Sequence, residues 1–185
     1  MKNLTKHSFL FSSQEWVGDG TITFNEFGHG LKFYTHWKVQ DLAEDHLTCI
    51  QEIEVEGLMD KTQNRFNLTN IKNNTFTISL ENESLGKVIG KGVYDDKTVA
   101  WEFSNKELGF EGFEVYELQE DGGYITRGEY ISIDQLRTII EGKIWKKVAV
   151  ESIDPKSKEK AGETTEQENA EVDKQNPTDE TPTED

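Results

Sequence analysis

The chain has 185 residues, with 20 lysines and arginines against 36 acids and a formal net charge of −16. This negative balance, without a basic stripe, argues against binding to nucleic-acid backbones or anionic membranes. The N-terminus has no apolar run typical of a signal peptide, and no stretch reaches transmembrane length, so we expect a cytoplasmic protein. The lone Cys49 excludes an internal disulfide and is expected to be buried and inert.

Composition divides the chain near residue 150. Residues 151–185 hold no aromatic residue, all three prolines, and twelve acids against four lysines. Such a segment cannot bury enough apolar surface to offset its ordering entropy, so we predict a disordered acidic tail. Residues 1–150 hold every Trp, Tyr and Phe, and about 150 residues suffice for a real core. We therefore predict one folded domain, 1–150, followed by a tail that offers a tether for a protein partner.

The first long strand is predicted over 16–24. Trp16 is followed on the same face by Gly18 and Gly20, and then by alternating β-formers. A strand face without side chains lets another backbone or a bulky ring approach closely, as a small barrel needs where its first strand bends over the core. Before this strand, the apolar residues 9–11 predict a single helical turn that caps one end of the barrel.

Alternation of apolar and polar residues predicts the strands that follow. It is clearest over 31–40, where Thr35 shares a face with four apolar side chains, and it repeats over 46–56, where Gln51 points inward. Shorter strands are expected at 63–69, 75–81, 87–94, 98–104, 110–118 and 123–131. The turn residues between them include Asn73-Asn74, which suits a two-residue hairpin because Asn tolerates positive φ.

The last segment, 132–148, is open to two interpretations. Its β-branched residues favour a strand, and Gly142 would cost a helix about 1 kcal/mol. We predict a final strand with a bulge near Gly142 that pairs with the first strand. A helix across 134–147 is the alternative.

Ten strands joined by short turns, with no proline in residues 1–150, predict antiparallel neighbours. Closing them into an up-and-down barrel removes the exposed edges, and a sandwich of two five-stranded sheets is the competing architecture. The Trp16-x-Gly18-x-Gly20 start and the ten-strand meander over roughly 10–148 resemble the calycin barrels, the group of lipocalins, fatty-acid-binding proteins and nitrobindin-like haem barrels.

This resemblance implies an all-β, calycin-like barrel in which the first-strand Trp closes one end beside a basic residue of the last strand. Arg137, or alternatively Lys146 or Lys147, is the candidate for that basic partner. The chain departs from the lipocalin pattern at Gln14, where lipocalins have Gly.

The resemblance gives no support for a cofactor. Nitrobindin-like barrels bind haem through a His near the C-terminal end of the barrel. The four histidines of this chain all lie in its first third, at His7, His29, His36 and His46. We therefore expect neither haem nor another cofactor.

No catalytic or metal-binding constellation stands out. Glu52, Glu54 and Glu56 share the outward face of one strand, which a solvated surface explains. The histidines are not clustered with Cys or Asp as a metal site requires. We predict that the protein is not an enzyme and holds no metal.

A barrel of about eight to ten strands either fills with side chains or encloses one small ligand. If it encloses one, Gln51 and Arg127 are candidates to orient the polar end of a small hydrophobic molecule. The aromatic candidates for the walls are Phe33, Trp37, Trp101 and Tyr124. Alternatively, Arg127 pairs internally with Glu129 or Glu114, or points outward. The alternative function is a protein–protein interaction module with a filled barrel and an acidic tail.

Overall fold

The structure, a computed structural model, describes residues 7–25 and 28–148. These described residues form ten β-strands, close to the positions that residue alternation predicts. The strands are β1 (Glu15–Phe24), β2 (Gly30–Leu42), β3 (His46–Val55), β4 (Thr62–Lys72), β5 (Thr75–Asn82), β6 (Gly86–Tyr94), β7 (Thr98–Asn105), β8 (Phe110–Leu118), β9 (Tyr124–Ile131) and β10 (Arg137–Lys146).

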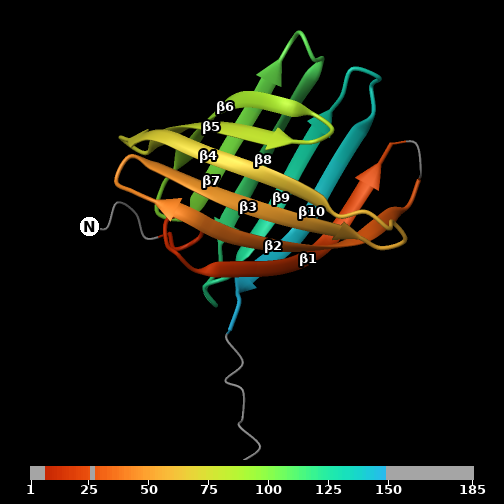
Figure 1. Ribbon diagram of the computed structural model, residues 1–185. Coiled ribbons are helices and arrows are strands. Elements are labelled where there is room, and N and C mark those ends of the chain that lie inside the picture. The colour runs from red at the N-terminus through yellow and green to blue at the C-terminus, as the bar shows by residue number, and fades with distance from the viewer. Residues whose placement is uncertain (1–6, 26–27, 149–185) are drawn as a thin grey trace, which may run out of the picture. The chain divides into compact units, whose positions relative to one another are not determined.

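The sheet closes on itself. Each strand pairs antiparallel with its neighbours in sequence, and β1 pairs with β10 from Trp16 opposite Lys146 to Phe24 opposite Thr138 (Figure 1). The prediction of a closed, antiparallel, all-β barrel is therefore confirmed, and the sandwich and the C-terminal helix are excluded.

The predicted bulge near Gly142 is wrong. The pairing of β10 runs without interruption past Gly142 on both of its sides. Irregular register occurs instead in β2, between Val39 and Asp41, and in β4, between Thr69 and Lys72. Gly142 serves the seam in another way, since it lies directly opposite Gly20 of β1 and leaves room there for the ring of Phe33 from β2.

Glycines allow the tight curvature at the seam between β1 and β10. A Cβ atom at Gly18 would lie 2.3 Å from the backbone oxygen of Lys143. A Cβ atom at Gly20 would lie 2.2 Å from the backbone oxygen of Glu141 and 2.7 Å from the Phe33 ring. No side chain fits at such distances, so this close approach requires glycine.

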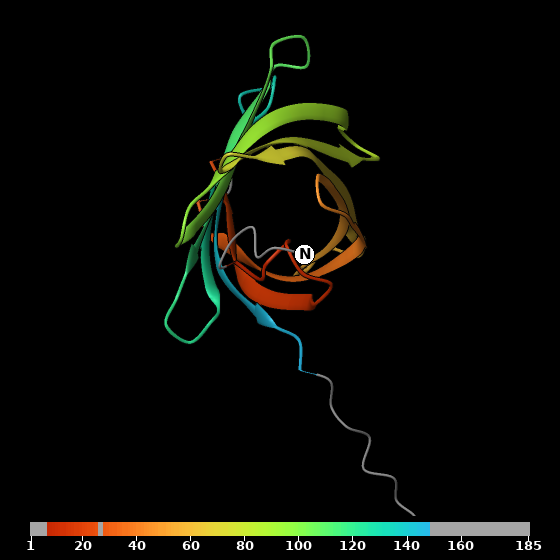
Figure 2. The same cartoon turned by 90° about the vertical axis from the view of Figure 1, so that its left-hand side faces the viewer.

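Residues 7–14 lie at one end of the barrel, which Figure 2 views along its axis. Phe9 and Leu10 are buried, and His7 hydrogen-bonds the Tyr124 hydroxyl at 2.9 Å and the Asp95 carbonyl at 2.6 Å. The segment makes a tight turn with Leu10 at φ 65°, so the predicted right-handed helical turn is wrong. We call this the closed end of the barrel.

The predicted acidic tail, 151–185, lies outside the described residues. Within 7–25 and 28–148, no helix has the length and apolar character needed to cross a bilayer. Cys49 is fully buried, and its burial raises the pKa of its thiol.

Candidate ligand-binding site

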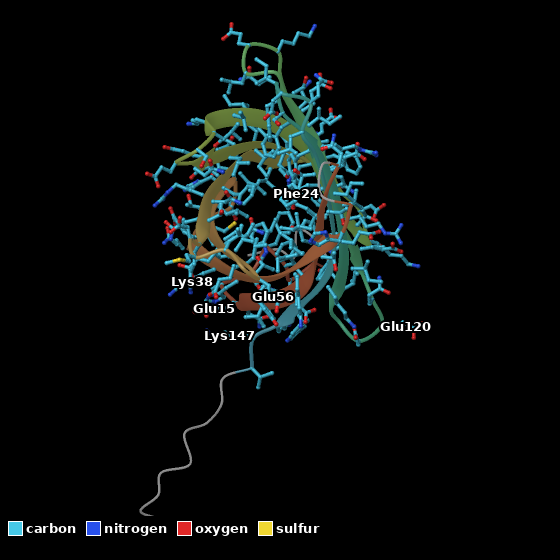
Figure 3. The ribbon with its side chains drawn as sticks, turned by 90° about the vertical axis from the view of Figure 1, so that its right-hand side faces the viewer. Glu15, Phe24, Lys38, Glu56, Glu120 and Lys147 are labelled. Atoms are coloured by element: carbon cyan, nitrogen blue, oxygen red, sulfur yellow. The ribbon has the colours of Figure 1, made fainter. Side chains whose placement is uncertain are left out.

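The end of the barrel opposite the closed end holds a cavity of about 310 Å³ that opens to solvent. We call it the mouth cavity. Figure 3 looks at the barrel from this side, with Phe24 and Glu56 near the rim. Residues from β3 to β5 and from β8 to β10, with the β5–β6 and β9–β10 loops, line the mouth cavity: Ile53, Thr62, Asn64, Phe66, Leu80, Asn82, Ser84, Leu85, Phe110, Glu114, Tyr130, Ser132 and Ile140.

A smaller and more enclosed cavity of about 30 Å³ lies deeper in the barrel. We call it the inner cavity; its walls include Phe33, Gln51 and Tyr116. The two cavities share Ile53, Glu114 and Ile140. Glu114 therefore stands at the junction between an apolar entrance and the barrel interior.

Glu114 is a buried carboxyl group held by two tyrosines. The Tyr116 hydroxyl donates to Oε2 at 2.6 Å and the Tyr130 hydroxyl donates to Oε1 at 2.5 Å. Burial raises the pKa of Glu114, and the two hydroxyl donors oppose this shift by stabilising the carboxylate. Burial, together with the neighbouring carboxyl group, also raises the pKa of both tyrosines, so they remain proton donors.

Two inward-facing glycines make room for this arrangement on β8 and β9. A Cβ atom at Gly112 would lie 2.0 Å from Cδ1 of Tyr130, so the tyrosine ring packs directly against the β8 backbone. A Cβ atom at Gly128, which pairs with Glu114, would lie 3.0 Å from Cγ of that glutamate. Phe110 stacks on Tyr130 with ring centroids 5.5 Å apart and fixes the tyrosine at the mouth.

On the facing wall, polar side chains satisfy one another across four strands. Gln51 donates to Thr35 Oγ1 at 3.2 Å, and Asn64 donates to Gln51 Oε1 at 2.9 Å. Asn82 donates to Asn64 Oδ1 at 2.9 Å and accepts the Leu85 backbone N–H at 2.7 Å. This amide chain gives each buried amide oxygen a partner, which a stable interior requires.

Aromatic side chains pack together in the barrel interior toward the closed end. They are Phe9, Trp16, Trp37, Phe66, Trp101, Tyr116 and Tyr124, and we call them the aromatic plug. Two of them, Phe66 and Tyr116, also reach the cavities. Ring centroids in the plug lie as close as 4.7 Å, between Phe9 and Tyr116, and 5.0 Å, between Trp101 and Tyr116. Among the described residues, the buried indole N–H groups of Trp16 and Trp37 have no acceptor, and none of the three tryptophans lines either cavity.

The structure places the predicted wall residues in different parts of the barrel. Trp37, Trp101 and Tyr124 belong to the aromatic plug, where they pack against other rings instead of facing empty space. Phe33 and Gln51 do line the inner cavity. The predicted candidates therefore do not form one site.

Arg127 does not point into the barrel. It is exposed on the outer face of β9, because its neighbours Thr126 and Gly128 occupy the inward positions. The internal pairs that we considered, of Arg127 with Glu114 or Glu129, are therefore wrong, and the outward alternative holds. Glu129 binds Arg137 instead, at 2.7 Å and 2.9 Å.

Arg137 does not lie beside Trp16. It begins β10 near the open end of the barrel, whereas Trp16 pairs with the last residues of that strand. Of the two alternative candidates, Lys146 lies over the Trp16 ring at 5.9 Å from its centroid, and Lys147 pairs with Glu15. The antiparallel direction of β10 decides this, since it brings the end of the strand to the start of β1.

Sequence reasoning missed the residues that form the mouth cavity. Glu114 and Tyr130 share the inward face with Gly112 and Gly128 in neighbouring strands. The outward face of β8 carries the apolar Phe113, so both faces of this strand mix polar and apolar residues and the sequence does not show which face is inward. The one available signal was the pair of inward glycines, which leaves space beside a bulky or polar partner.

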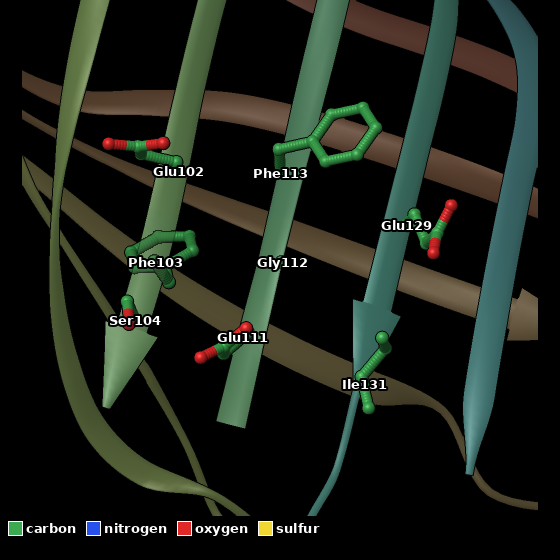
Figure 4. A pocket seen from close by; sticks show the side chains of 8 residues that line it. All are labelled: Glu102, Phe103, Ser104, Glu111, Gly112, Phe113, Glu129 and Ile131. Atoms are coloured by element: carbon green, nitrogen blue, oxygen red, sulfur yellow. The ribbon is translucent and has the colours of Figure 1, made fainter. Parts of the chain in front are cut away.

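A second, shallow groove of about 370 Å³ lies on the outer face of β7, β8 and β9 (Figure 4). Phe113 is 44% exposed beside it, and Glu102, Glu111 and Glu129 contribute carboxylates. Among the described residues, no group of three or more His, Cys, Asp or Glu could hold a metal ion, here or elsewhere.

Comparison with solved structures supports the barrel architecture, whereas comparisons of the sequence find no match. No family model and no curated protein sequence matches the chain. Among solved structures, Rv2717c from M. tuberculosis is 13% identical with a TM-score of 0.59, and the match covers 76% of this chain and 94% of that one. The S-type phycobiliprotein lyase CPES from Guillardia theta is 8% identical with a TM-score of 0.59, covering 77% and 92%. The chain is thus a closed ten-stranded antiparallel barrel whose structural neighbours have a calycin-like fold.

Proposed function

We propose that the protein binds a small, largely hydrophobic molecule in the mouth cavity, without a catalytic step. The observation that carries the proposal is a solvent-open cavity of about 310 Å³ with apolar walls and a buried carboxyl group at its base. Small-molecule sites are typically clefts of about 300–1,000 Å³ with mostly apolar linings and few polar groups. The mouth cavity is at the lower end of that range, which favours a compact ligand.

The open mouth supports a ligand barrel over an interaction module with a filled interior. The aromatic plug packs toward the closed end, whereas the mouth cavity at the other end is open to solvent. The structural neighbours support the architecture of this proposal alone, since their identities are 13% and 8%.

The test is a titration with the neutral fluorescent probe N-phenylnaphthylamine, which brightens in apolar sites. Leu85 lies at the rim of the mouth cavity, so Leu85→Trp adds bulk inside it and is expected to weaken probe binding at least about tenfold. Leu108→Trp is the matched control, because Leu108 is an exposed loop residue that lines neither cavity. We expect that control to bind the probe as the wild type does.

The proposal is wrong if the wild-type protein does not bind the probe, or if Leu85→Trp and Leu108→Trp bind it equally well. Native mass spectrometry of protein purified from its own host adds a direct readout. We expect an adduct with the mass of a small molecule, which Leu85→Trp reduces.

A further inference from the structure

The carboxylate of Glu114 keeps unused acceptor capacity toward the cavities. Only 6% of Glu114 is exposed, and each carboxylate oxygen accepts a hydrogen bond from one tyrosine hydroxyl. A carboxylate offers about four lone-pair positions, so the two hydroxyls occupy only half of them. The amide chain on the facing wall differs, because its amide oxygens already accept hydrogen bonds from within the protein.

No cation of the described chain faces Glu114. Of the described residues that line the two cavities, none is Lys, Arg or His. The titratable groups that face Glu114 are Tyr116 on its own strand and Tyr130 on β9, and the other lining residues do not ionise. A buried carboxylate without a cationic partner is costly, and a ligand that brings a positive charge relieves that cost.

The aromatic rings near Glu114 also suit a cation. The stacked pair Phe110 and Tyr130 lines the mouth cavity, and aromatic faces attract ammonium groups. The acidic balance of the whole chain, −16, adds a weaker attraction at long range. A ligand with an anionic end would be repelled by the Glu114 carboxylate, by the aromatic ring faces and by the net negative charge of the chain.

From this geometry we propose that the polar end of the ligand is a primary or secondary ammonium, which binds Glu114, while its apolar part lies along Ile53, Leu80 and Leu85. This inference rests on the proposed function, because it names the chemical class of ligand for the same cavity. When the ammonium binds a protonated Glu114, one proton leaves the carboxyl group for solvent, and an ion pair remains. The ligand is therefore a small alkylamine or arylalkylamine, whose nitrogen is protonated near neutral pH.

The experiment compares three probes of equal chain length by isothermal titration calorimetry near neutral pH: octylamine, octanol and octanoate. For the wild type we expect octylamine to bind at least about tenfold more tightly than octanol, and octanoate to bind most weakly. Glu114→Gln is expected to remove the amine preference, so that octylamine binds no more tightly than octanol. Glu117→Gln, an exposed carboxylate on the outer face of the same strand, is the matched control and should keep the amine preference.

A measurement on the wild type alone guards against a misfolded Glu114→Gln variant. As pH falls and Glu114 becomes protonated, octylamine affinity should decrease while octanol affinity stays constant. Equal affinities for octylamine and octanol, or amine binding that Glu114→Gln leaves intact, would overturn the inference while the proposed function stands. If neither probe binds, and N-phenylnaphthylamine does not bind either, both proposals are wrong.

Discussion

At the scale of single residues, Glu114 is the least ordinary group in the described chain. Most buried polar groups here belong to hydrogen-bonded amide or hydroxyl pairs, but Glu114 is an acid whose partners are two neutral hydroxyls. Desolvation disfavours the ionised form and raises the pKa, whereas the tyrosine hydrogen bonds favour the ionised form. The pKa moves upward because the desolvation exceeds the stabilisation by the hydroxyls.

A raised pKa makes stability depend on pH in a defined direction. The folded protein holds the Glu114 proton more tightly than the unfolded chain, so the contribution of Glu114 is fully present below its unfolded pKa. This contribution is lost as pH rises through the folded pKa. We expect the free energy of unfolding of the wild type, relative to Glu114→Gln, to decrease as pH rises above the unfolded pKa of about 4. Urea unfolding of both proteins measures the difference, and a difference that stays constant as pH rises would contradict the prediction.

At the scale of elements, strands β8 and β9 shape the site because each has one glycine, without a side chain, at an inward position. In both cases a large or charged side chain of the other strand occupies the space: Tyr130 lies against Gly112 and Glu114 lies beside Gly128. A strand interior normally disfavours glycine, and its use here fits a close approach between ring and backbone. The cavity therefore depends on backbone space as much as on the side chains around it.

Gly112→Ala tests this dependence. Its Cβ would lie 2.0 Å from the Tyr130 ring and 2.7 Å from the backbone oxygen of Glu129, so the ring must move. Overpacking of this kind costs roughly 1–3 kcal/mol in the free energy of unfolding. We also expect weaker binding of N-phenylnaphthylamine, because Tyr130 lines the mouth. Ser104→Ala, at an exposed position on β7, is the control, and a Gly112→Ala variant as stable as that control would refute the argument.

At the scale of the whole barrel, closure between β1 and β10 joins strands that are far apart in sequence. Besides the strand pairing, Glu15 contacts residues on both sides of β1 at the seam. Its backbone oxygen accepts the Lys147 backbone N–H at 2.9 Å. Its carboxylate binds Lys147 Nζ at 2.9 Å and His36 Nε2 at 2.8 Å. Hydrogen bonds from Lys147 and His36 lower the pKa of Glu15 to about 2. Because the Glu15 side chain is 33% exposed and solvent screens the ion pairs, we expect a modest contribution of roughly 1 kcal/mol or less.

Hydrogen exchange tests closure directly. In a closed barrel, β1 and β10 each have a hydrogen-bonded strand on both sides. Their backbone amides should therefore exchange as slowly as those of β4 and β5. In an open sheet, half of the amides of each edge strand would face solvent and exchange rapidly. Residue-resolved exchange by NMR distinguishes these cases, and fast exchange throughout β1 and β10 would contradict closure.

The sequence by itself determined strands β1 to β9, the turn at Asn73-Asn74, where both residues have positive φ, and the antiparallel pairing of neighbours. These features follow from local rules, because side chains alternate along each strand and short turns force antiparallel neighbours. The inward, buried positions of Thr35 and Gln51 follow from the same alternation. The sequence favoured a closed barrel and a final strand, but the two-sheet sandwich and the C-terminal helix were excluded only by the structure.

Only the tertiary structure decided which inward residues face a cavity. Trp37 and Tyr124 obey the alternation as well as Phe33 does, yet they fill the closed end while Phe33 lines the inner cavity. Likewise, alternation alone left Arg127 and Glu114 free to face either side, because both faces of their strands are amphipathic. Register across the barrel, and the depth of each residue along its axis, depend on contacts between distant strands. The sequence of a single strand does not contain information on those contacts.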